Sequence, residues 1–97
     1  MTEAEAWESI ADYMEGTGEM VPCDTFGETN CDGLCSSIYS MADDNVITPR
    51  VMHKMMHRLL YVYGREHHPT DYYWPEGRVA PRIKACRRLA ELARRER

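Results

Sequence analysis

Apolar residues recur at helical spacing in four segments of this 97-residue chain, and this pattern most limits how the chain can fold. The segments lie at about residues 2–15, 30–42, 48–63 and 79–94. An apolar residue at every third or fourth position gives one buried face of an amphipathic helix. No segment sustains the alternation of apolar and polar residues that a strand requires. The sequence therefore predicts an all-α fold, a compact bundle of about four helices that forms a single domain over residues 1–97.

Start and stop signals delimit these segments. Thr2 and Glu5 have the spacing of a capping box, which opens the first helix. Residues 43–45, Asp-Asp-Asn, are expected to end the second helix, while Gly16 and Gly18 are expected to end the first.

The third helix should begin with Thr48 as its N-cap and Pro49 as its first residue. Its outer side then carries one basic stripe, because Arg50, Lys54 and Arg58 are each four residues apart. The last helix combines an inner face of apolar residues with a basic remainder that includes Arg82.

The charges are divided between the two halves of the chain. Residues 1–49 contain eleven Asp and Glu and no Lys or Arg, whereas residues 50–97 contain all twelve Lys and Arg and five Asp and Glu. The formal charge is therefore −11 for the first half and +7 for the second, in agreement with a net charge of −4. The halves can pair within one subunit, pair between subunits, or present an acidic and a basic face. The acidic array on the first helix would consist of Glu3, Glu8, Asp12, Glu15 and Glu19.

Several protein classes fit the sequence poorly. No apolar run approaches the roughly 18 residues of a membrane span, and the acidic start is unlike a signal peptide, so we expect a cytoplasmic protein. The net charge and a pI near 5.5 argue against a dedicated DNA-binding protein, and direct contact with nucleic acid is not expected.

The four cysteines allow a zinc site. Cys31 and Cys35 would point the same way on a helix, Cys23 could approach them from the preceding loop, and Cys86 or a histidine could complete a tetrahedron. This spacing differs from the usual paired CxxC knuckles, so the favoured interpretation is separate buried thiols without a metal or other cofactor.

No constellation specifies a reaction. His53 and His57 are spaced as in a metalloprotease helix, but Lys54 stands where that motif needs its glutamate base. The sequence also lacks a glycine-rich phosphate loop and a nucleophile elbow. We therefore expect a binding protein and not an enzyme, with no catalytic residue.

The strongest candidate ligand site lies around the segment 71–78. Tyr72, Tyr73 and Trp74 offer aromatic faces on which a base could stack. Phosphate could be held by Arg78 and Arg82, helped by Arg50 or Arg58. The competing interpretation is that the three aromatic residues fill the small core.

Four short stretches resemble a family of small accessory proteins of tailed bacteriophages and prophages. They are Cys31–Ile38, Tyr72–Pro75, Arg82–Ile83 and Cys86–Leu89, which match a GLC-x-x-I helix start, a Y-x-W-P turn and an arginine-leucine pattern in the following helix. The resemblance covers about residues 31–92 and implies a phage protein in the host bacterial cytoplasm. By analogy, such a protein would counter host defence.

The function expected on these grounds is sequestration of an anionic nucleotide signal by a homo-oligomer. Two alternatives stay open. The acidic first helix could imitate nucleic acid and inhibit a host defence protein, for example a CRISPR effector. The protein could also be a small zinc-stapled regulator.

Overall fold

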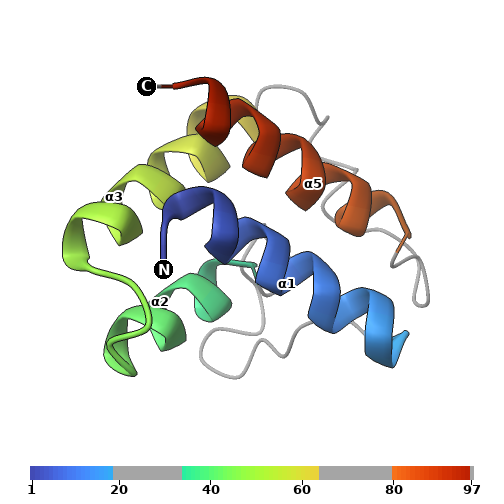
Figure 1. Cartoon of the computed structure of the whole chain (residues 1–97), viewed down its shortest axis with the longest axis horizontal. Coiled ribbons are helices and arrows are strands. Elements are labelled where there is room, and N and C mark those ends of the chain that lie inside the picture. Colours follow the sequence, from blue (N-terminus) through green and yellow to red (C-terminus); the bar gives the residue numbers. More distant parts are fainter. Residues whose placement is uncertain (19–33, 64–79, 97) are drawn as a thin grey trace.

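The helices of the structure lie where the sequence pattern predicts them. The computed structural model describes residues 1–18, 34–63 and 80–96. Its elements are α1 (Glu3–Thr17), α2 (Leu34–Asp43), α3 (Pro49–Arg58), the π-helix η1 (Leu59–Tyr63) and α5 (Ala80–Arg95). The described residues contain no strand. The predicted all-α bundle of about four helices is confirmed (Figure 1).

The first helix has a capping structure at each end. Thr2 Oγ1 accepts a hydrogen bond from the Glu5 N–H at 3.2 Å, and Glu5 Oε1 accepts one from the Thr2 N–H at 2.8 Å, so the predicted capping box is formed. The backbone N–H and the hydroxyl of Thr2 hold the pKa of Glu5 below its ordinary value. At the other end, Gly18 takes the left-handed conformation with φ of 69° and donates its N–H to the Met14 carbonyl.

A short turn joins α2 to α3. The second helix ends at Asp43, and Asn45 enters the left-handed region with φ of 59°, as the predicted stop at residues 43–45 requires. Thr48 Oγ1 then accepts a hydrogen bond from the Val51 N–H at 3.2 Å, and Pro49 is the first residue of α3. Both predicted start signals are confirmed. The predicted start of the second helix, after Thr29 or Asn30, lies outside the described residues.

The core joins all the helices. Trp7 and Met14 from α1 are fully buried with Ile38 from α2, Met55 from α3 and Leu89 from α5. The helices α1 and α5 lie side by side and run in opposite directions, and α3 crosses near the start of α1 (Figure 1). This arrangement brings the acidic first helix directly against the basic last helix.

The cysteine expectation can be examined only at Cys86. Its thiol is fully buried in α5, and burial raises its pKa to about 12, which makes it a poor nucleophile. This agrees with the interpretation of a buried thiol. Cys23, Cys31 and the side chain of Cys35 lie outside the described residues.

Two expectations about the helices need correction. Arg82 was predicted to lie on the basic remainder of the last helix, but it is only 3% exposed. Its position is three, four and seven residues before Ala85, Cys86 and Leu89, so helical spacing places it on the buried side, where the arginine stem can pack. The third segment is also not one regular α-helix, because it widens into η1 at Leu59.

Candidate functional site

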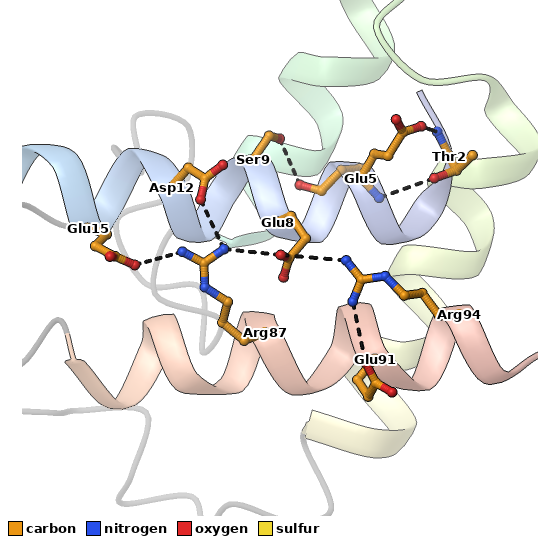
Figure 2. A network of polar contacts seen from close by, with 10 residues as sticks. Thr2, Glu5, Glu8, Ser9, Asp12, Glu15, Arg87, Glu91 and Arg94 are labelled. Carbon is orange, nitrogen blue, oxygen red and sulfur yellow. Dashed lines mark hydrogen bonds and ion pairs between the residues drawn. The ribbon is translucent and has the colours of Figure 1, made fainter.

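The interface between α1 and α5 is a network of ion pairs. Arg87 lies among three carboxylates of α1, at 3.3 Å from Glu8, 2.9 Å from Asp12 and 2.6 Å from Glu15 (Figure 2). Hydrogen bonds to Glu15 and Asp12 hold the pKa of Arg87 above its ordinary value. Arg94, two turns further along α5, contacts Glu8 at 3.5 Å. The stripe of carboxylates on α1 therefore faces guanidinium groups of the same chain.

Glu3 has a different environment from the other acidic residues of α1. It is 8% exposed, and its Oε2 accepts hydrogen bonds from Trp7 Nε1 at 3.0 Å and Arg58 Nε at 2.5 Å. Arg58 also forms an ion pair with Glu96 beyond the end of α5. Of the arrangements that the divided charge allows, the described residues show pairing within one chain.

The outer side of α3 and η1 carries cations without such compensation. We define the α3 face as the exposed side chains that recur every three or four residues along these elements: Arg50, His53, Lys54, His57 and Tyr61. The sequence has no Asp or Glu from residue 45 to residue 65. Within the described ranges, no carboxylate lies at ion-pair distance from Arg50 or Lys54, in contrast to Arg87 and Arg94. The α3 face is thus a positive surface in a chain of negative net charge.

Aromatic rings mark the C-terminal end of the α3 face. The rings of His57 and Tyr61 are in contact, with centroids 4.6 Å apart and planes tilted by 38°. Tyr61 is 51% exposed and the neighbouring Leu60 is 55% exposed. Tyr61 and Leu60 belong to η1, and π-helical segments are rare and frequently occur at functional sites.

A hollow of about 440 Å³ lies where the starts of α1 and α3 approach the end of α5. Its charged lining consists of Glu3, Glu5, Lys54, Arg58, Arg94 and Glu96. Three cations and three carboxylates cancel in formal charge, and Arg58 is already bonded to two of the carboxylates. The hollow therefore has no net attraction for an anion, and Lys54 is its one charged group that also belongs to the α3 face.

The predicted ligand residues do not form one cluster in the described part of the chain. Arg50 is exposed on α3, Arg58 is 13% exposed and bonded to Glu3, and Arg82 is buried in α5. Tyr72, Tyr73, Trp74 and Arg78 lie outside the described residues. Sequence reasoning placed Lys54 on an outer basic stripe and considered His53 and His57 as a pair with metalloprotease-like spacing, but it missed Tyr61. The absence of acidic residues between 45 and 65 was the signal that could have identified this face.

Other kinds of site receive no support from the described residues. Within residues 1–18, 34–63 and 80–96, no group of three or more His, Cys, Asp or Glu side chains could hold a metal ion. Of the helices in those ranges, none combines the length and apolar character that crossing a membrane requires. Comparisons of the chain with protein-family models, with curated proteins and with solved structures find no match.

Proposed function

We propose that this protein is a bacteriophage accessory protein that acts in the host cytoplasm by binding and sequestering an anionic nucleotide, without turning it over. The phage context rests on the resemblance of residues 31–92 described above. The observation that carries the anionic ligand is the α3 face, where Arg50 and Lys54 are exposed and have no carboxylate partner in the described part of the chain. The aromatic segment at Tyr72–Trp74, with Arg78, remains a predicted contributor.

The distribution of ion pairs favours α3 over α5 as the anion-binding helix. An anion that approaches Arg87 or Arg94 also meets the carboxylates that already neutralise these groups. An anion that approaches Arg50 and Lys54 meets no acidic residue of α3 or η1, and the carboxylates that share the hollow with Lys54 belong to α1 and to Glu96, which follows α5. Arginine supplies forked hydrogen bonds to phosphate, and lysine supplies a mobile point charge.

The geometry gives less support to an inhibitor that imitates nucleic acid. Glu8, Asp12 and Glu15 share Arg87, and Glu3 is buried against Trp7 and Arg58. These ion pairs offset much of the negative charge that the stripe could present to a partner protein, although the Asp12 and Glu15 side chains are 69% and 63% exposed. The zinc-stapled alternative likewise has no observation in its favour, since the described residues contain no group of three or more potential metal ligands.

Self-association belongs to this proposal. An exposed helical face covers a ligand from one side only, whereas ligand sites usually bury most of a small molecule. A second copy of the chain, related by a two-fold axis, would supply an equivalent face and enclose the nucleotide between subunits.

The test is the binding of nucleotides to the full chain by isothermal titration calorimetry. Arg50→Ala combined with Lys54→Ala should weaken binding by roughly a hundredfold, since each lost phosphate contact removes a charge-assisted hydrogen bond. Lys84→Ala combined with Arg88→Ala is the matched control, because it removes two exposed cations from α5 and leaves α3 intact. If both double variants lost the same affinity for nucleotide, the loss would reflect the net charge of the protein and not a site on α3. If the wild-type chain bound no nucleotide, the proposal would be wrong.

A further inference from the structure

We propose that the α3 face selects its nucleotide by the number of phosphates and scarcely by the identity of the base, with the base on the His57–Tyr61 pair and the phosphates at Lys54 and Arg50. This inference rests on the proposed function and assigns roles within the same face. It starts from the order of side chains along the helix: Arg50 and Lys54 occupy the N-terminal part of the face, together with His53, and the two rings that contact each other, His57 and Tyr61, occupy the C-terminal part.

The spacing of these two parts suits a nucleotide that lies along the helix. Lys54 and Tyr61 are seven residues apart, which corresponds to roughly 10 Å at the rise of an α-helix. A nucleotide has its planar base at one end and its charged phosphates at the other, separated by the sugar. A molecule of this kind can contact both parts of the face at once, whereas inorganic phosphate can contact only the cationic part.

The aromatic end can stack on a base with little discrimination. Tyr61 is half-exposed, its ring already contacts His57, and the apolar Leu60 lies beside it. Every base has a π-face, so stacking on such a platform tolerates all four bases. Base identity is instead read by hydrogen bonds to base edges. Next to the rings, the α3 face carries the His57 imidazole nitrogens and the Tyr61 hydroxyl, and each of these groups can donate or accept a hydrogen bond, so we expect weak base selectivity.

The cationic end can distinguish one phosphate from two. Arg50 and Lys54 are one helical turn apart, which places their side chains next to each other on the same stripe. A diphosphate can engage both cations, whereas a monophosphate held by stacking at the other end reaches Lys54 first. Each additional phosphate also increases the charge attracted to this face.

The inference is tested by titrating the full chain with ADP, GDP, CDP, AMP and inorganic pyrophosphate. The three diphosphates should bind with affinities within about fivefold of one another, and AMP should bind at least tenfold more weakly than ADP. Tyr61→Ala should weaken the binding of ADP by roughly tenfold and leave the binding of pyrophosphate unchanged, because only ADP has a base that stacks on the Tyr61 ring. Tyr61→Phe keeps the ring and should restore binding of ADP to within about twofold of the wild type.

The outcomes separate this inference from the proposed function. If ADP binding is lost in the Arg50 and Lys54 variant but is insensitive to Tyr61→Ala, or if one base is strongly preferred, the inference is wrong while nucleotide binding at α3 stands. If neither nucleotides nor pyrophosphate bind, both are wrong. Because Tyr61 is exposed, its variants should fold, and their helical content by circular dichroism verifies this.

Discussion

Arg58 Nε donates a 2.5 Å hydrogen bond to Glu3 Oε2, which fixes the first turn of α1 to the end of α3. The same carboxylate oxygen accepts the indole N–H of the fully buried Trp7. A buried carboxylate is tolerated because both of these donors satisfy it. Residues 55 positions apart in the sequence are thereby held together.

Removal of the Glu3 carboxylate should destabilise the fold strongly. Glu3→Ala leaves the Trp7 N–H and the largely buried Arg58 without this acceptor, so we expect the free energy of unfolding to fall by about 2–4 kcal/mol. Urea denaturation followed by circular dichroism measures this change. Glu91→Ala removes only exposed ion pairs and should cost at most about 1 kcal/mol. A loss no larger than that of Glu91→Ala would contradict the buried role of Glu3.

The charge interface between α1 and α5 should depend on ionic strength. Arg87→Ala leaves Glu8, Asp12 and Glu15 facing each other without their shared cation, so the melting temperature should fall more than in Lys84→Ala. Added NaCl should reduce the difference in melting temperature between the two variants, since salt screens exposed charges. Thermal melts of both variants at low and high NaCl provide the comparison. Identical melting of the two variants at low salt would argue against the interface.

Cys86 should make stability decrease in alkali. Burial raises the pKa of its thiol from 9.0 to about 12, so the native state holds this proton more tightly than the unfolded chain. The stabilisation is complete below pH 9.0 and is lost as the pH rises from there towards about 12. The difference in unfolding free energy between the wild type and Cys86→Ala, measured by urea titration at several pH values, should therefore shrink above pH 9.0. Ionisation of Tyr and Lys is common to both proteins and cancels. A difference that does not change with pH would show that the thiol is exposed to water.

The N-cap of α3 should contribute to the order of the helix that carries Arg50. Thr48→Ala removes the acceptor of the Val51 N–H and should lower the free energy of unfolding by about 1 kcal/mol. Thr48→Ser keeps a hydroxyl acceptor and should preserve most of this stability. Urea denaturation of the two variants distinguishes the role of the Thr48 hydroxyl from that of its methyl group. If both variants lost the same free energy of unfolding, the effect would come from packing of the methyl group and not from the cap.

Local signals made much of the fold predictable. The capping box at Thr2 and Glu5, and Thr48 followed by Pro49, act within a few residues, so their effect does not depend on tertiary contacts. The apolar spacing likewise identified buried positions in each helix. The burial of Arg82 was missed because its positive charge was taken to indicate an exposed position. Its helical spacing from Cys86 and Leu89 nevertheless places it on the buried side of α5.

The candidate site was less accessible to sequence reasoning. Whether the acidic half pairs internally depends on which helices lie side by side, and no local pattern determines that α5 lies along α1. Only this pairing reveals that Arg87 and Arg94 are neutralised while Arg50 and Lys54 are not. The widening at Leu59, which precedes the exposed Tyr61, has no sequence signal in Leu59–Tyr63 that we can identify.

A titration of the ¹⁵N-labelled full chain with ADP, followed by two-dimensional NMR, tests binding at the α3 face most directly. We predict saturable shifts of the amide signals between Arg50 and Tyr61, with small changes in α1 and at Lys84 on the outer side of α5. The Arg50→Ala and Lys54→Ala double variant should lose these shifts. Shifts centred on α1 or α5, or no shifts at millimolar ADP, would contradict nucleotide binding by this face.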